Sequence, residues 1–356
     1  MPDRRVVWES SDPAAGWRDA RDLLVSAHPA PPFADPALVD GLRTVFRPGE
    51  SLRVATSSDE SGTPRGQLAL VLRRTLHGPI LVRQLEGGPR NQASLSEFLG
   101  AADPAAAIDL LEQIRMQSDW DLLELRAVPA AGALARAAIA VGATVRPDVP
   151  AHAIELEPGT AILSPERRRR LGRLRRRMAE ATAIQVERVV PDEPRWGATV
   201  TALTHWHVDR WDQSRSPSPF ASAQVTTRFV QLLAAPPHGV HPVATVLRHP
   251  ESGTISGVVL GFRSGEAIHA WRIAYDRSLS EYSPGIQMVT ELANWGMETG
   301  IKVLEMGRGA EPYKQTWRCI VRDRVTVRWH RPTAATRALG LIARLTGRSG
   351  LAGWGG

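Results

Sequence analysis

Hydrophobic and polar residues in the first half of the chain follow two alternating patterns, one typical of strands and one typical of helices. Ile108, Leu111 and Ile114 fall on one face of a helix predicted over 104–117, with Asp103 as its N-cap. The other predicted elements are a helix over 36–46 with Asp35 as its N-cap, a helix over 130–141, and strands over 52–55, 67–73, 79–85, 120–127 and 153–156. Strands that alternate with helices in this order predict an α/β domain.

The second half repeats a similar order of elements. Its predicted elements are helices over 196–211, 220–234 and 283–299, and strands over 184–189, 243–248, 254–263, 267–275, 303–306 and 324–330. The repeated order predicts a duplicated fold. The predicted parts are a first domain at 1–160, a basic connector helix at 161–182, a second domain at 183–332, and a C-terminal amphipathic helix and tail at 333–356.

The connector is the most biased segment of the chain. Leu171, Leu174 and Met178 form an apolar stripe at helical spacing, behind a helix start at Ser164. Eight arginines between positions 167 and 177 cover the rest of the helix. The segment has two interpretations, a phosphate or RNA contact and a solvated connector helix, and we favour the connector.

Composition limits the classes of function. The 356 residues suggest two domains, and the net charge of +7 is compatible with anionic partners. Cys319 is the only cysteine, which excludes an intrachain disulfide and a four-cysteine zinc site within one chain. No run of about 18 apolar residues predicts a membrane span, and the N-terminus lacks the apolar core of a secretory signal. The cytosol is therefore the expected compartment.

The stretch from 267 to 299 carries the strongest sign of chemistry. A predicted strand ends at Tyr275, and the following helix starts at Ser283-Pro284-Gly285. Serine suits an N-cap, proline suits the first helical turn, and glycine allows close approach of a ligand to the backbone. The N–H groups of a first turn bind anions, so this start predicts a phosphate site, although it also fits a well-capped helix without a ligand.

Motifs in this region resemble the GNAT superfamily of acyl-CoA acyltransferases, over about residues 30–330. They are Tyr275-Asp276, Tyr282-Ser-Pro-Gly285, and Arg308-Gly309-x-Glu311-Pro312-Tyr313-Lys314-x-x-Trp317, with His207-x-x-Arg210-Trp211 upstream. The chain resembles most the CelD-like branch linked to bacterial cellulose biosynthesis, and more distantly the FemABX aminoacyl-tRNA-dependent transferases. The resemblance implies two tandem GNAT-like domains, each a mixed β-sheet flanked by helices, with the first one degenerate.

The resemblance also implies a donor and a site for it. The donor would be acetyl-CoA or another acyl-CoA. Its pyrophosphate would lie on Ser283, Pro284, Gly285 and Ile286, and the strand carrying Ile273 and Tyr275 would hold the pantetheine arm. The Ser-Pro-Gly start departs from the superfamily pattern of two spaced glycines, which bears on acetyl-CoA specificity. No covalent intermediate is needed, so Cys319 is expected to be a core thiol.

Further side-chain roles follow from the same resemblance. Tyr313 would protonate the departing thiolate, and Lys314 would orient the acceptor or a phosphate. Asp276 and Glu311 are candidate general bases, with a loop turn and a helix cap as their alternatives.

A third group of residues would contact the acceptor. It comprises His207, Arg210, Trp211 and Trp317, of which Trp317 suits packing better. His205 and His207 diverge around their helix, so we expect no metal site.

These expectations lead to three hypotheses of function. The first is an acyltransferase that uses acetyl-CoA and acts on an amine or hydroxyl of a sugar, a polysaccharide precursor or a secondary metabolite. The second is an aminoacyl-tRNA-dependent transferase, which fits the basic balance and the arginine-rich helix. The third is a ligand-binding protein that kept the fold without turnover. None of the three needs a DNA partner.

Overall fold

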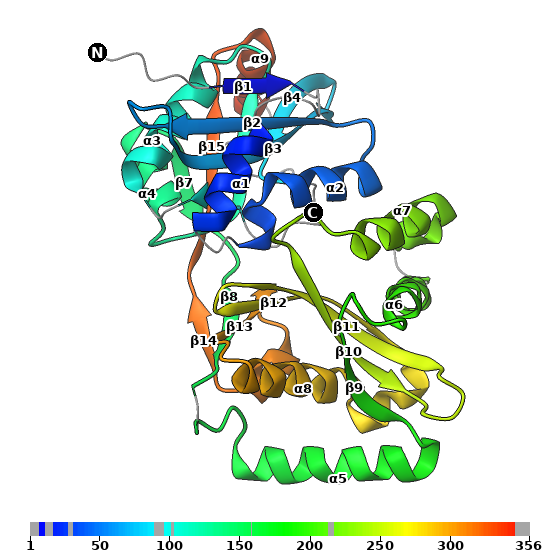
Figure 1. Cartoon of the computed structure of the whole chain (residues 1–356). Helices are drawn as coiled ribbons and strands as arrows, with labels where there is room; N and C mark the ends of the chain where they lie inside the picture. The colour runs from blue at the N-terminus through cyan, green and yellow to red at the C-terminus, as the bar shows by residue number, and fades with distance from the viewer. Residues whose placement is uncertain are drawn as a thin grey trace. The chain divides into compact units, whose positions relative to one another are not determined.

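A computed structural model describes residues 7–10, 17–27, 31–88, 96–100, 103–157, 159–212 and 217–345 of the chain. The chain divides into two compact units, unit 1 with Met1–Val149 and Asp323–Gly356, and unit 2 with Pro150–Arg322. Each unit is built on its own mixed sheet flanked by helices, which confirms the predicted fold class (Figure 1).

The sheet of unit 1 has the strand order β1-β2-β3-β4-β6-β15-β7, with the short β5 paired to β3. Only β4 and β6 run parallel among its described strands. The strands are β1 Val7–Ser10, β2 Ser51–Ser58, β3 Pro64–His77, β4 Ile80–Glu86, β5 Leu99–Gly100, β6 Leu122–Pro129, β7 Thr144–Pro147 and β15 Arg324–His330. The helices are α1 Trp17–Ala27, α2 Pro36–Phe46, α3 Pro104–Met116, α4 Ala133–Ala140 and α9 Ala334–Leu345.

Two helices of unit 1 begin as the sequence predicts. The side chains of Asp35 and Asp103 accept the N–H groups of Ala37 and Ala105, and each aspartate precedes a proline at the first helical position. Such caps satisfy N–H groups that a helix start otherwise leaves without a partner. The buried face of α3 then packs on β2 and β3 through Leu110, Leu111 and Ile114 among others.

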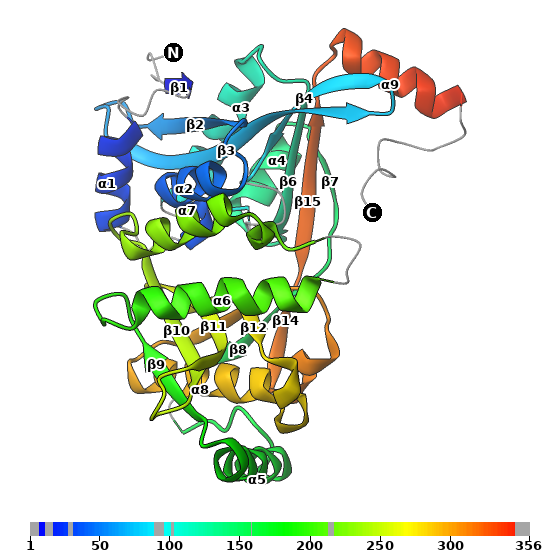
Figure 2. The same cartoon turned by 90° about the vertical axis from the view of Figure 1, so that its right-hand side faces the viewer.

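The sheet of unit 2 has the order β14-β8-β13-β12-β11-β10-β9. Its strands are β8 Ala151–Glu155, β9 Gln185–Val189, β10 His241–Arg248, β11 Ile255–Ser264, β12 Ala267–Tyr275, β13 Val303–Arg308 and β14 Cys319–Arg322. Its helices are α5 Pro165–Thr182, α6 Trp196–Trp211, α7 Ala223–Ala234 and α8 Pro284–Glu298, with 3-10 turns η2 Pro219–Ala221, η3 Arg277–Tyr282 and η4 Pro312–Thr316. Helix α8 covers one face of the sheet and α6 the other, as Figure 2 shows.

The two sheets have the same plan, which supports the predicted duplication. In both, four consecutive antiparallel strands lead to one parallel pair, β4–β6 in unit 1 and β12–β13 in unit 2. Beyond each parallel pair lie an antiparallel strand and a second edge strand.

In each sheet, the strand next to the parallel pair is one that the sequence assigned to the other domain. We expected 153–156 to close the first domain and 324–330 to close the second. Instead β8 pairs with β13 and β14 in unit 2, and β15 pairs with β6 and β7 in unit 1. The chain therefore passes from unit 1 to unit 2 between residues 149 and 150 and returns between residues 322 and 323. Local periodicity identifies a strand but not its pairing partner, which explains the difference.

Candidate functional site

The parallel ladder between β12 and β13 is short. It joins Ala267 to Val303, Ile268 to Leu304 and His269 to Glu305, and goes no further. β12 continues to Tyr275, while β13 stays paired with β8 up to Arg308, across a register shift between Glu305 and Arg308. The two parallel strands therefore diverge after three residue pairs, in the middle of the sheet.

A bulge interrupts β12 just beyond that ladder. Leu260 faces Arg272 and Gly261 faces Ala270, so Trp271 is an extra residue. A Cβ at Gly261 would lie 2.8 Å from the His269 carbonyl oxygen, so this close approach requires glycine. A bulge turns two consecutive side chains toward the same face.

Trp271 and Arg272 consequently both point to the face that carries α6, η2 and α7. The ring centroids of Trp271 and Phe229 lie 5.8 Å apart. The Arg272 guanidinium carbon lies 4.8 Å from the centroid of Trp271 and 5.9 Å from that of Phe220, both within reach of a cation–π interaction. Burial lowers the pKa of Arg272 to about 10.

His207 of α6 is buried and connects this arginine to η2. Its Nδ1 lies 2.8 Å from Ser218 Oγ, and its Nε2 lies 3.5 Å from Arg272 Nη1. Arginine can only donate, so Nε2 accepts and the proton of the neutral ring is on Nδ1. Burial, followed by the charges of Arg272 and Arg210, lowers the pKa of His207 to about 4. The ring is therefore neutral at pH 7.

Arg210 reaches from the same helix to the diverging strand. Its guanidinium donates to the Ile273 carbonyl oxygen of β12 at 3.4 Å, and its own carbonyl accepts from Arg277. The charge of Arg210 also acts on Tyr313 of η4, where it opposes a net rise in the pKa of the phenol. Arg210 thus links three elements, α6, β12 and η3, beside the point where the ladder ends.

Tyr313 keeps its proton at neutral pH. Partial burial of the ring, with a smaller contribution from the Glu311 carboxylate, raises its pKa to about 12 against the opposing charge of Arg210. The residue is 38% exposed, and its ring meets Trp317 edge to face at 6.2 Å. Trp317 itself is a core residue whose indole N–H donates to Thr290 Oγ1.

Lys314 lies inside unit 2 and is 1% exposed. Its Nζ lies 3.2, 2.7 and 3.0 Å from the carbonyl oxygens of Gly307, Arg308 and Gly309, and 2.8 Å from Glu311 Oε2. An ammonium has three N–H groups, and four oxygens surround this one. Lys314 therefore shapes the loop after β13, and this geometry differs from the predicted contact with acceptor or phosphate.

The two predicted general bases hold the backbone or a cation. The Asp276 carboxylate accepts the Ser278 N–H at the start of η3, which is the turn that we named as its alternative role. Burial raises the pKa of Glu311, but the hydrogen bond and charge of Lys314 outweigh it, so the net pKa lies below the ordinary value. A carboxylate in that state is a weak base.

The start of α8 differs from a standard cap. Ser283 has φ of 54° and ψ of 51°, in the left-handed region, and its side chain makes no capping hydrogen bond. The N–H groups of Ile286 and Gln287 donate to the Ser283 carbonyl, and Pro284 has no N–H. Within the described part of the chain, the Gly285 N–H makes no backbone hydrogen bond.

Gly285 has a packing role as well. A Cβ there would lie 2.9 Å from Ile273 Cδ1 and 3.3 Å from Tyr275 Cε1. The side chains of Ile273 and Tyr275 thus point at α8, and only their backbone can serve a ligand beside β12. A substitution at Gly285 would disturb packing whether or not a phosphate binds there.

The structure brings some predicted site residues together and separates others. His207, Arg210 and Trp211 lie around the diverging strand, where the ring centroids of His207 and Trp211 are 6.0 Å apart, and Tyr313 lies within range of the Arg210 charge. Sequence reasoning missed Trp271, Arg272, Ser218 and Phe220. A charged residue within the apolar strand 267–275 was the available signal for Arg272.

Comparison with known proteins identifies a domain within unit 2. Residues 165–315 match the model of the acetyltransferase (GNAT) domain. Unit 2 carries a GNAT domain. No curated protein matches the sequence. The comparisons leave the narrower likeness to the CelD-like branch as a prediction.

Solved structures share the fold of both units. A structure titled FemX covers 94% of this chain and 99% of its own, with a TM-score of 0.64 and 9% identity. The match to L-PGS from Bacillus licheniformis covers 96% of this chain and 98% of L-PGS, with a TM-score of 0.56 and 12% identity. The match to the C-terminal domain of a putative lysylphosphatidylglycerol synthetase from Agrobacterium fabrum covers 92% of this chain and 97% of that domain. Its TM-score is 0.54 and its identity is 10%.

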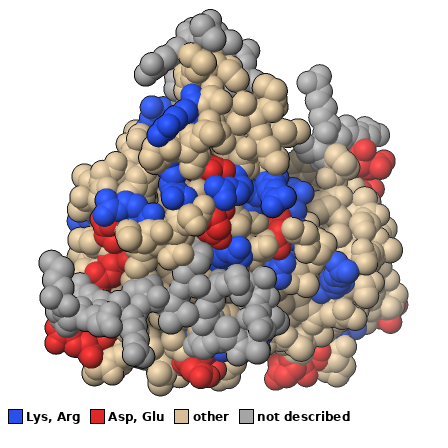
Figure 3. Space-filling view, turned by 90° about the horizontal axis from the view of Figure 1, so that it is seen from above, with Lys and Arg blue, Asp and Glu red and all other residues tan. Residues whose placement is uncertain are grey.

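Two further findings concern the surface and the helices. On the face shown in Figure 3, Lys and Arg side chains lie among Asp and Glu side chains rather than in one basic patch. Among the helices that the structure describes, none combines the length and the apolar character that crossing a membrane requires.

The neutral state of His207 gives a test of the site around the GNAT strand β12. Its pKa is about 4 in the folded protein and about 6.5 in an unfolded chain, so the unfolded chain binds the proton first as pH falls. We expect the free energy of unfolding to fall by about 3 kcal/mol more in the wild type than in His207→Gln between pH 7 and pH 4. Urea unfolding at several pH values measures this difference.

His205→Gln, on the exposed side of the same helix, is the matched control. It should leave the pH profile of the wild type unchanged. Parallel profiles for wild type and His207→Gln would contradict a buried neutral imidazole at this position.

Proposed function

We propose that the chain transfers an acyl group from an acyl-CoA, in the first place acetyl-CoA, to an amine or hydroxyl of a sugar, a polysaccharide precursor or a secondary metabolite. The coarse class rests on the GNAT domain of unit 2. The observation that carries the proposal is the diverging pair β12–β13, with Arg210 and Tyr313 beside the end of the ladder.

The residues present fit such a donor. Residues 270–275 of β12 lie beyond the ladder with β13, where an extended pantetheine arm could pair with the backbone. At the start of α8, the Ser283 hydroxyl and the Gly285 N–H are two donors that the helix itself does not use. Together with the positive end of the helix dipole, they suit the oxygens of a pyrophosphate.

The chemistry of the transfer follows from these positions. The donor supplies a thioester carbonyl, which the lone pair of the acceptor attacks while the carbon–sulfur bond breaks. Tyr313, protonated at neutral pH, gives a hydrogen bond to the departing sulfur, and Arg210 stabilises the negative charge that develops there. Because Glu311 and Asp276 are weak or occupied bases, the proton of the acceptor goes to water.

Two variants at Ser283 distinguish an effect on ligand binding from an effect on folding. Ser283→Ala removes the hydroxyl and keeps a side chain in the left-handed conformation, whereas Ser283→Gly removes both the hydroxyl and the strain. We expect both variants to bind acetyl-CoA about tenfold more weakly by calorimetry, the loss of one charge-assisted hydrogen bond. Ser283→Gly should be more stable than Ser283→Ala by about 1 kcal/mol.

An unchanged affinity in both variants would show that the Ser283 hydroxyl does not contact the donor. A fall in affinity that followed stability, and so appeared only in Ser283→Ala, would instead indicate a folding defect.

A variant at Tyr313 distinguishes an effect on catalysis from an effect on donor binding. Tyr313→Phe keeps the ring on Trp317 and removes the hydroxyl. We expect kcat to fall about 100-fold with little change in the KM for acetyl-CoA, because the hydrogen bond to sulfur strengthens only in the transition state. Steady-state kinetics with a detected acceptor measure both constants.

Lys314→Met is the contrasting variant. Its loss leaves three carbonyl oxygens without their cation, so we expect lower stability and a general loss of activity rather than a selective effect on kcat. A wild-type kcat for Tyr313→Phe would contradict the role of the hydroxyl.

A second candidate function, aminoacyl-tRNA-dependent transfer, rests on the arginine-rich helix α5. Its buried Met178 faces the domain, and Arg167, Arg175 and Arg177 contact carbonyls or carboxylates of unit 2. Arg169, Arg173 and Arg176 project from the opposite side.

These three arginines form a cationic row on α5. They are exposed and make no ion pair or hydrogen bond within the described residues. They span about 10 Å along the helix, and arginine is well suited to phosphates.

The triple variant Arg169→Gln, Arg173→Gln, Arg176→Gln distinguishes the two candidates. For an acyl-CoA enzyme we expect activity and acetyl-CoA affinity within about twofold of wild type. The three arginines are exposed and distant in sequence from the proposed donor site, and exposed charges of this kind contribute little to binding. A triple change of Arg47, Arg74 and Arg146 to Gln removes the same charge from exposed positions of unit 1 and serves as the control.

Binding of charged tRNA by gel shift gives the second measurement. Salt-dependent tRNA binding that the α5 triple variant loses and the control keeps would favour the aminoacyl-tRNA candidate. If neither donor is turned over although acetyl-CoA binds, the chain is a ligand-binding protein without turnover.

A further inference from the structure

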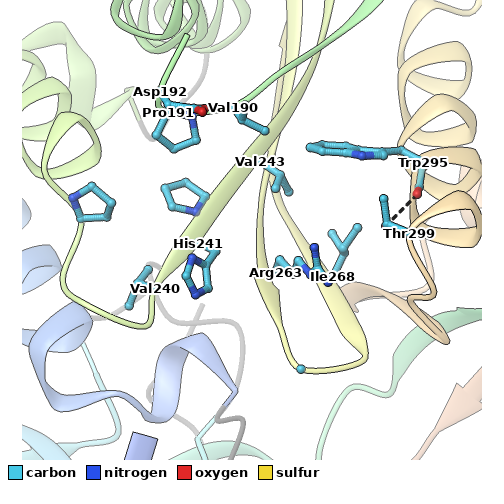
Figure 4. A pocket seen from close by; sticks show the side chains of 13 residues that line it. Val190, Pro191, Asp192, Val240, His241, Val243, Arg263, Ile268, Trp295 and Thr299 are labelled. Carbon is cyan, nitrogen blue, oxygen red and sulfur yellow. Dashed lines mark hydrogen bonds between the residues drawn. The ribbon is translucent and has the colours of Figure 1, made fainter. Parts of the chain in front are cut away.

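Unit 2 contains a pocket at the opposite end of the sheet from the diverging strands (Figure 4). Its volume is about 670 Å³, and it lies where β10 and β12 begin and β11 ends. The C-terminal part of α8 contributes Trp295 and Thr299 to its wall. β12 therefore begins beside this pocket and reaches the candidate acyl-transfer site only at its other end.

The inner wall of the pocket is apolar. Val243 and Ile268 belong to the hydrophobic core of unit 2, and the Trp295 indole extends toward them from α8. Prolines 191, 236 and 242 add rigid apolar surface. Pockets of this size and composition bind small molecules with apolar bodies.

The rim of the pocket carries two adjacent nitrogen-bearing side chains. His241 of β10 and Arg263 of β11 are direct partners across the antiparallel ladder, and Arg263 is in turn the partner of Ile268. Direct partners point to the same face with Cβ atoms about 5 Å apart. The imidazole and the guanidinium therefore stand side by side at the edge of the apolar wall.

Arg263 is available to a ligand. Its side chain is exposed, and within the described residues it makes no ion pair or hydrogen bond. The nearby acid Glu266 is paired with Lys302, and Asp192 lies on the far side of the pocket from Arg263 in Figure 4. A guanidinium presents two parallel N–H groups that match a carboxylate.

We propose that this pocket is a second small-molecule site, which binds an organic monocarboxylate with an aromatic or branched apolar body. The carboxylate pairs with Arg263, with His241 beside it, and the apolar body lies against Trp295, Val243 and Ile268. The site is separate from acyl transfer and does not depend on the proposed function.

Calorimetric titration of the full chain with 3-phenylpropionate and with its neutral amide, 3-phenylpropanamide, tests the proposal. The two probes have nearly the same shape, so their difference reports the carboxylate. We expect the acid to bind at least about tenfold more tightly than the amide, the contribution of one charge-assisted pair. Equal affinities, or no binding of either probe, would overturn the proposal.

Variants then locate the binding. Arg263→Gln should reduce the affinity for the acid to that of the amide and leave the amide unchanged, and because Arg263 is exposed this variant should fold. Trp295→Phe should weaken both probes, because the wall loses apolar area. Arg318→Gln, an exposed arginine of unit 2 outside the pocket, should change neither. Acid binding that survives Arg263→Gln would place the ligand elsewhere and contradict the site.

Discussion

The parallel ladder between β12 and β13 ends after three residue pairs, and the arrangement of the candidate site depends on that end. A continuous ladder would use the backbone of residues 270–275 for the sheet itself. The bulge at Trp271 reinforces the divergence, because it turns Trp271 and Arg272 to the α6 face and leaves Ile273 and Tyr275 facing α8. The strand thus presents one cation, Arg272, and one aromatic ring, Trp271, on one face, and packing residues on the other.

Buried polar and charged side chains of unit 2 make contacts that fix the backbone around the candidate site. Lys314 ties the loop after β13 to Glu311, and a neutral His207 lies between Ser218 and Arg272. Buried polar groups of this kind are costly when they lose a partner, so each one restricts the backbone around it. Tyr313 follows directly in the chain from the loop that Lys314 holds, and its position therefore depends on that cation.

The sequence was sufficient for most of the helices and longer strands and for the GNAT domain, because these are encoded in local patterns, but it missed the short strands β1, β5, β7 and β14. Caps at Asp35, Asp103 and Ser164 mark three helix starts, and Met178 is the buried residue of the predicted stripe on α5. It was insufficient for features that arise from long-range pairing. The exchange of β8 and β15 between units, the left-handed Ser283 and the position of Arg272 beside His207 all depend on distant partners. Lys314 shows the same limit, since the resemblance implied contact with the acceptor or a phosphate and the fold uses the ammonium to bind carbonyl oxygens.

Hydrogen–deuterium exchange of the full chain, with and without acetyl-CoA, tests most directly whether an acyl-CoA occupies the diverging strands. The account predicts slower exchange at residues 270–275 of β12 and at 283–287 at the start of α8. Residues 241–243 and 263–268 around the separate pocket should exchange at the same rate in both samples. Unchanged exchange at 270–275 under saturating acetyl-CoA, or protection confined to other segments, would contradict it.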